Sequence, residues 1–65
     1  MDNLKIAENL RNLRGDKSQR EVADAVGVTA MAISLYESGE RIPKDEIKVR
    51  LAKYYNTTVD AIFFN

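Results

Sequence analysis

A chain of 65 residues is long enough for one small domain, which buries only a modest fraction of its surface on folding. The sequence contains no cysteine and no histidine, which excludes disulfides, Cys/His zinc sites and imidazole acid-base catalysis. Ten basic and ten acidic residues give a net charge of zero, so any nucleic-acid-binding character must come from the distribution of charge and not from its sum.

A first helix is predicted over about residues 4–14 and ends at Gly15. Its apolar residues recur at helical spacing and share one face: Ile6, Ala7, Leu10 and Leu13. Such a stripe is typical of a helix that packs on a core.

A second helix is predicted to begin near Gln19 and to stop at Gly27. Ser18 and Glu21 form an S-x-x-E capping box, in which the serine oxygen accepts an amide of the first turn and the glutamate returns to the cap amide. Gly27 stops the helix because glycine takes the left-handed conformation at little cost. The apolar face consists of Val22, Ala23 and Val26.

A third helix is predicted from Ala30 to about Tyr36, with Thr29 as its N-cap and a Ser-Gly stop at residues 38–39. The turn that separates it from the second helix has the length that a helix-turn-helix requires, over about residues 19–38. Ala23 is small where the two helices must approach each other. The apolar anchors of the turn and the third helix are Val28, Ile33 and Tyr36.

A fourth helix is predicted after Pro43, from about Lys44 to Tyr55, and a short fifth helix from Val59 to Phe63. Asn56 and Thr58 are the expected caps between them. The residues expected to point inward are Ile47, Leu51, Ala52, Tyr55, Val59, Ile62 and Phe63. No strand-like alternation occurs, so the sequence predicts an all-α fold with a single domain over residues 1–65.

The basic residues fall into two groups, Arg11, Arg14, Lys17 and Arg20 in the first and Arg41, Lys44, Lys48, Arg50 and Lys53 in the second. They form a basic face if the fold gathers them, or a scattered set of solvated charges if it does not. The sequence leaves both arrangements open.

Over nearly its whole length the chain resembles the Cro and phage-repressor family of helix-turn-helix proteins, often called XRE-type. The matching stretches are IAENLRNLR, SQREVADAVGVTAMAISLYESGERIP and LAKYYNTTVDAIFF. The resemblance implies a compact five-helix bundle similar to the DNA-binding domain of lambda repressor. It also implies a third helix that lies in the major groove, and a homodimer on a two-fold operator.

The resemblance implies roles for particular residues. Ser18 and Gln19 fall at positions where the family binds a phosphate or assists readout. The alternative is that Ser18 is only a helix cap and that Gln19 is only an exposed side chain. Arg14 and Glu37 fall where many members have an ion pair that turns the arginine toward the DNA backbone. Arg41 and Lys44 are expected to contact phosphates, or else to be solvated.

The third helix is expected to present Thr29, Ala30, Met31, Ser34 and Leu35 to the base edges. This set departs from the family pattern, because it holds no Arg, Gln or Asn for a bidentate contact to guanine or adenine. Readout is therefore expected to depend on thymine methyl groups, on hydroxyl bonds and on DNA shape. The alternative is a protein-interaction module, of the antitoxin or regulator-partner type, with a degenerate DNA-reading helix.

Phe63 and Phe64 are both large and apolar, and a dimer contact through them is expected, one ring packing in the core and the other meeting a partner subunit. The expected function is transcriptional regulation, as a repressor that binds double-stranded DNA. No enzymatic activity, cofactor, metal, membrane or small-molecule ligand is expected. The expected location is the cytoplasm of a bacterium, with the chain bacterial or phage-encoded and associated with the nucleoid.

Overall fold

The computed structural model describes residues 3–64, and over this range the chain forms five helices and no strand. The helices are α1 (Asn3–Arg14), α2 (Gln19–Val26), α3 (Ala30–Ser38), α4 (Asp45–Tyr54) and α5 (Val59–Phe63). The predicted all-α class is confirmed. The predicted helix ends hold to within two residues, since α3 continues to Ser38 and α4 is one residue shorter at each end.

Hydroxyl caps begin three of the helices. Ser18, Thr29 and Thr58 each accept, at 3.0 Å, the backbone amide of the residue three positions further on. A cap of this kind satisfies one amide that the helix itself leaves without a partner, and its loss costs about 1 kcal/mol. The predicted capping box is only half formed, because over residues 3–64 the Glu21 carboxylate makes no bond back to the Ser18 amide.

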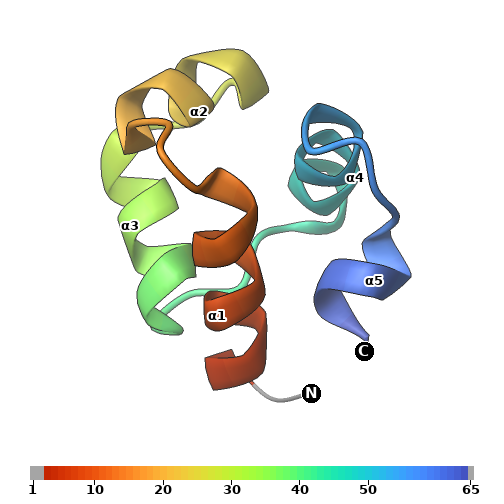
Figure 1. The fold of residues 1–65 in the computed structure, drawn as a ribbon. Helices are drawn as coiled ribbons and strands as arrows, with labels where there is room; N and C mark the ends of the chain where they lie inside the picture. Colours follow the sequence, from red (N-terminus) through yellow and green to blue (C-terminus); the bar gives the residue numbers. More distant parts are fainter. Residues whose placement is uncertain (1–2, 65) are drawn as a thin grey trace.

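The helices are arranged with α1 between two pairs, α2 with α3 on one side and α4 with α5 on the other (Figure 1). α1 packs against α3 and α5, and α2 packs against α3 and α4. Side chains from all five helices fill the space between them: Ile6, Leu10, Val22, Ala23, Val26, Ala32, Ile33, Tyr36, Ile47, Leu51, Ala52, Ile62 and Phe63. Burial of each large apolar side chain contributes roughly 1.5–3 kcal/mol.

A polar contact closes the bundle between its first and last helices. The side-chain amide of Asn9 donates to the backbone carbonyl of Ile62 at 3.0 Å. This bond satisfies a carbonyl in the last turn of α5, where the short helix has no amide of its own to offer. α1 and α5 are therefore held together by a directed bond as well as by apolar packing.

Leu13 does not join the core, and its predicted place there is wrong. Its side chain is 37% exposed, on the rim of a shallow hollow of about 240 Å³ between α1 and α5. The side chains across from it, Thr57 and Ala61, are too short to cover a leucine at this end of α1. No helix within residues 3–64 is long and apolar enough to cross a membrane.

Candidate nucleic-acid interface

The turn between α2 and α3 is built on Gly27, which has φ 78° and ψ 35° in the left-handed region. The amides of Gly27 and Val28 both donate to the carbonyl of Ala23, at 2.9 and 3.0 Å. These bonds satisfy carbonyl groups at the end of α2, and the chain turns within three residues so that α3 begins at Ala30. Ala23 is 2% exposed and, being small, allows α2 and α3 to cross closely.

Arg50 of α4 supports this turn from behind. Its Nη1 donates to the carbonyl of Val26 at 3.3 Å, at the end of α2. A Cβ atom on Gly27 would lie 3.3 Å from the same Nη1, so the guanidinium packs closely against the glycine. In the sequence Arg50 belongs to the second basic group, but in the structure its bond to Val26 fixes the helix-turn-helix to α4.

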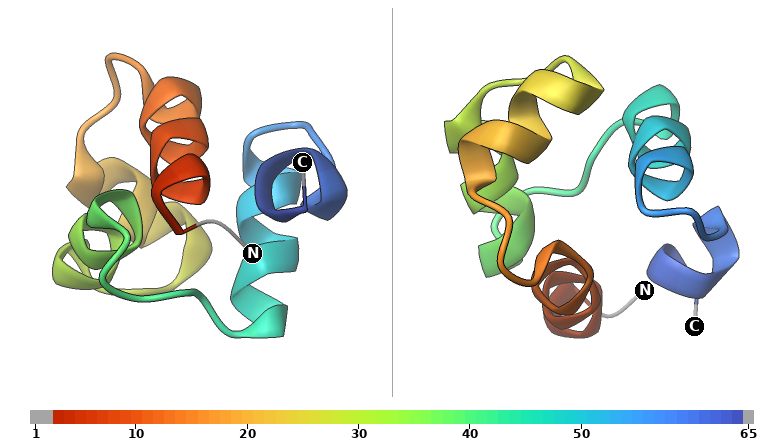
Figure 2. Two further views of the ribbon diagram at one scale, coloured as in Figure 1. Left: turned by 90° about the horizontal axis from the view of Figure 1, so that it is seen from below. Right: turned by 45° about the horizontal axis from the view of Figure 1, so that its top comes forward.

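α3 has a buried face and an outward face, as the sequence predicts. Its buried residues are Ala32, Ile33, Tyr36 and Glu37. We define the outward face by the five residues Thr29, Ala30, Met31, Ser34 and Leu35. Met31 is 72% exposed, Thr29 and Ser34 are exposed, and Ala30 and Leu35 are half-buried. α2 and α3 form one flank of the bundle, and none of the other helices of residues 3–64 covers its outer side (Figure 2).

Glu37, at the end of α3, is 4% exposed and joins three helices. Its Oε2 accepts from Nε of Arg14 at 2.8 Å, and its Oε1 accepts from Nε2 of Gln19 at 3.1 Å. Its backbone carbonyl accepts from the guanidinium of Arg11. The structure thus brings together Arg14 and Glu37, the two residues that the family resemblance pairs.

The Arg14 side chain is fixed at two points. Besides its bond to Glu37, it donates from Nη1 to the carbonyl of Lys17 at 2.6 Å. The hydrogen bond to the Glu37 carboxylate raises the pKa of Arg14 above its ordinary value. Over residues 3–64 its Nη2 makes no hydrogen bond, so this end of a preset guanidinium remains for an external oxygen such as that of a phosphate.

Gln19 is not simply exposed. A carboxylate can only accept hydrogen bonds, so the contact with Glu37 requires the amide nitrogen of Gln19 to face inward. Its side chain is half-buried and held between α2 and α3. A signal for this bond is present in the sequence, since Glu37 lies four residues after Ile33 on the buried face and a carboxylate there needs donors.

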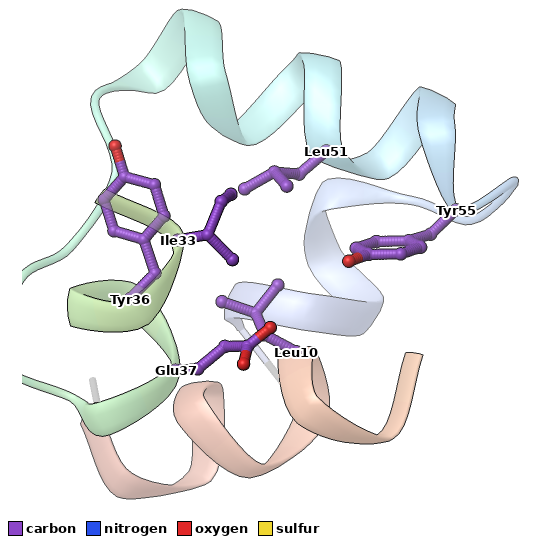
Figure 3. A pocket seen from close by; sticks show the side chains of 6 residues that line it. All are labelled: Leu10, Ile33, Tyr36, Glu37, Leu51 and Tyr55. Carbon is purple, nitrogen blue, oxygen red and sulfur yellow. The ribbon is translucent and has the colours of Figure 1, made fainter. Parts of the chain in front are cut away.

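Tyr55 faces Glu37 across the core from the end of α4. Its hydroxyl is directed toward the carboxylate, with Leu10, Ile33 and Leu51 around the space between them (Figure 3). Burial, with a further contribution from the negative charge of Glu37, raises the pKa of Tyr55 to about 12. The Glu37 carboxylate therefore acts electrostatically on Tyr55, just after α4, while it accepts hydrogen bonds from Arg14 of α1 and Gln19 of α2.

The basic residues of the two groups have different environments in the structure. Arg41 and Lys44 are exposed and form no ion pair over residues 3–64. Lys48 is only 9% exposed, and its ammonium lies 5.6 Å from the ring centroid of Phe63 and 5.7 Å from that of Phe64. Such cation–π contacts make Lys48 part of the packing of α4 on α5.

The two terminal phenylalanines have separate environments. Phe63 is 2% exposed and packs in the core, so the dimer contact predicted for it does not fit its position. A buried ring of the last helix cannot reach a partner without unpacking the bundle. Phe64 is 62% exposed and keeps the surface position that such a contact needs.

Ser18 is exposed and caps α2 through its hydroxyl.

Residues 3–64 contain no group of carboxylate side chains that could hold a metal ion. The arrangement instead combines an uncovered helix face with fixed or exposed cationic groups beside it. A convex helix with positive groups on its flanks is suited to the major groove of a duplex between two phosphate backbones.

Comparisons with known proteins agree with this geometry. A family model described as helix-turn-helix matches residues 8–62. The cryptic phage CTXphi transcriptional repressor RstR of Vibrio cholerae is 34% identical over 61 residues, which are 91% of this chain and 54% of that protein. The chain therefore spans about half the length of this relative. The solution structure of the SOS-response transcriptional repressor LexA from Eubacterium rectale superposes with a TM-score of 0.84 at 28% identity, covering 94% of this chain and 69% of that one.

Proposed function

Because this chain belongs to the helix-turn-helix family whose model matches residues 8–62, we propose that it binds operator DNA and represses transcription by occupying a promoter. The observation that carries the proposal is the uncovered outward face of α3, where Met31 is 72% exposed although it is large and apolar. A helix that is buried on one side and uncovered on the other fits a groove about 12 Å wide.

The contacts to the DNA backbone come from the flanks of α3. Arg14 reaches a phosphate with the Nη2 group that its bonds to Glu37 and Lys17 leave over. Arg41 and Lys44 reach phosphates on the other side, from the loop that follows α3. Contacts of this type set the position of the protein on the duplex without reading its sequence.

The active species is a homodimer on a two-fold operator. Two copies then place their α3 helices in successive major grooves, roughly 34–36 Å apart. The exposed ring of Phe64 is the contact between copies. Analytical ultracentrifugation tests this assembly, and a chain that stays monomeric at high concentration, both free and on DNA, contradicts it.

Selection of bound duplexes from a random pool tests DNA binding directly. The expected result is enrichment of a palindrome, with half-sites one helical turn apart. Met31→Glu places a carboxylate on the outward face, where phosphates repel it, and should abolish enrichment. Val49→Glu is the matched control, since Val49 is 44% exposed on α4 and receives the same charge away from α3.

The two variants separate DNA binding from a protein-interaction role. If the unmodified chain enriches no duplex, the proposed function is wrong. If it enriches duplexes and Met31→Glu still does so, the outward face of α3 is not the surface that enters the groove.

A further inference from the structure

The polar groups around the outward face of α3 are largely used inside the protein. The hydroxyl oxygen of Thr29 accepts the amide of Ala32 at 3.0 Å, because Thr29 caps the helix. Gln19 donates its amide nitrogen to Glu37 at 3.1 Å. Ser38, one turn beyond Ser34, donates to the carbonyl of Leu35 at 3.0 Å. None of these groups is left with a full set of donors and acceptors for a base edge.

The groups that remain are mostly apolar. Met31 is 72% exposed, and Ala30 and Leu35 are half-buried beside it. Ser34 alone adds an exposed hydroxyl without a bond to the rest of residues 3–64. A bidentate contact, which identifies guanine or adenine, needs two polar atoms in a fixed arrangement, and this face does not supply them.

The major groove offers an apolar side chain one kind of apolar partner, the methyl group at C5 of thymine. 5-Methylcytosine carries the same methyl group at the same place. The two bases differ at the neighbouring C4 position, where thymine has an acceptor and cytosine has a donor. A thioether makes at most weak hydrogen bonds, so it senses the methyl group and not the C4 substituent.

We propose that Met31 is the specificity-determining residue of α3 and that it reads a C5-methyl group, accepting 5-methylcytosine as well as thymine. The inference rests on the proposed function, because it concerns DNA bound at the outward face of α3. Binding to a site with cytosine at the contacted position would then rise when that cytosine is methylated.

Four synthetic duplexes test the proposal at each pyrimidine of the selected half-site. They carry thymine or uracil opposite adenine, and 5-methylcytosine or cytosine opposite guanine, so that each pair of duplexes differs by one methyl group only. At the contacted position we expect each methyl group to strengthen binding about fourfold, the effect of burying one such carbon. The two ratios, thymine over uracil and 5-methylcytosine over cytosine, should agree.

Met31→Ala should bring both ratios to about one, because it removes the side chain that contacts the methyl group. Val49→Ala is the matched control on α4 and should retain both. The proposal is overturned if neither pair shows a methyl effect at any position, if only the thymine pair does, or if the effect persists in Met31→Ala. A chain that binds none of the four duplexes overturns the proposed function, and this inference with it.

Discussion

Glu37 shows how one buried carboxylate can organise a small domain. Its two oxygens accept from Arg14 and Gln19, which belong to α1 and α2, while Glu37 itself belongs to α3. Burial of a charge is costly unless donors surround it, so these partners offset the cost of burying the Glu37 carboxylate. The same bonds set the direction of the guanidinium that we assign to a phosphate.

A double-mutant cycle tests this dependence. Arg14→Leu should lower the free energy of unfolding by about 1.5–3 kcal/mol, because the buried carboxylate loses its charged donor. Adding Glu37→Leu should restore part of that loss, since no unpaired charge then remains. Denaturant unfolding measures the three variants, Arg14→Leu, Glu37→Leu and the double variant. If the losses of the two single variants simply add in the double variant, the coupling is absent.

The exposed ion pair of Lys5 and Glu8 provides the control for this cycle. Its atoms are 3.5 Å apart, and both side chains are more than half exposed. An exposed pair of this kind couples by only about 0.2–1 kcal/mol. Lys5→Ala and Glu8→Ala should therefore give a smaller coupling energy than Arg14 and Glu37 do.

Tyr55 makes the free energy of unfolding fall with rising pH in the alkaline range. Its pKa in the folded protein is raised from 10.0 to about 12, so the folded chain keeps the phenol proton where the unfolded chain loses it. The stabilisation is complete below pH 10 and is lost as the pH rises from 10 to 12. The slope cannot exceed about 1.4 kcal/mol per pH unit, the limit for a single proton, and should stay below it because the ring is half-exposed and solvent screens it.

Comparison with Tyr55→Phe separates the contribution of the Tyr55 phenol from that of the other groups that titrate at high pH. Urea unfolding at pH values across this range should give a smaller decline for the phenylalanine variant. Equal declines for the two proteins would show that the Tyr55 hydroxyl titrates as an unfolded residue does.

At the residue scale, the sequence predicts which side chains face inward better than it predicts their polar partners. The family resemblance predicts the ion pair of Arg14 with Glu37 from their positions. It does not indicate that Gln19 donates to the same carboxylate. Lys48 has the spacing of a surface cation, yet it is buried and its ammonium lies near the rings of Phe63 and Phe64. Contacts of this kind depend on how α4 and α5 cross, which no local pattern records.

Helix starts follow from local chemistry, and the caps test this at the element scale. Thr29 and Thr58 accept equivalent amide bonds at 3.0 Å, but only Thr29 belongs to the outward face of α3. Thr29→Ala and Thr58→Ala should each cost about 1 kcal/mol of stability through the lost cap. Only Thr29→Ala should also weaken DNA binding at a concentration and temperature where both variants are fully folded.

Thermal unfolding and titration of the selected duplex measure these two effects. Thr29→Ser keeps a capping hydroxyl and should recover the stability. If Thr58→Ala weakens DNA binding as much as Thr29→Ala does, the loss reflects general destabilisation and not the outward face.

The elements themselves could be predicted closely because their signals are local. Capping hydroxyls, Gly27 and Pro43 fix where helices begin and end, and these signals do not depend on the rest of the fold. The position of Leu13 could not be predicted in this way. Its spacing places it on the apolar stripe of α1, but whether a stripe is covered along its whole length depends on the size of residues in α5.

At the scale of the whole molecule, the net charge is zero, so DNA binding depends on where the basic residues lie on the surface. Lys44 is exposed at the start of α4, next to the loop that follows α3. Lys44→Gln should weaken binding to all duplexes and reduce the slope of log affinity against log salt by about 1, the contribution of one phosphate.

Lys53→Gln is the matched control, since Lys53 is equally charged and exposed but lies in the last turn of α4. It should leave the slope unchanged. Fluorescence anisotropy across a series of salt concentrations measures both variants. Equal slopes for Lys44→Gln and the unmodified chain would remove Lys44 from the phosphate contacts.

The bond from Asn9 to the carbonyl of Ile62 spans 53 positions of the chain. During synthesis, α1 leaves the ribosome well before the segment that it must pack against has been translated. The nascent chain can cover α1 on its α3 side first, but the side of α1 that packs on α5 stays exposed until α5 has cleared the exit tunnel. A ribosome stalled before Val59 is added should carry a protease-sensitive polypeptide, and one stalled after an added C-terminal linker that spans the exit tunnel should carry a resistant one.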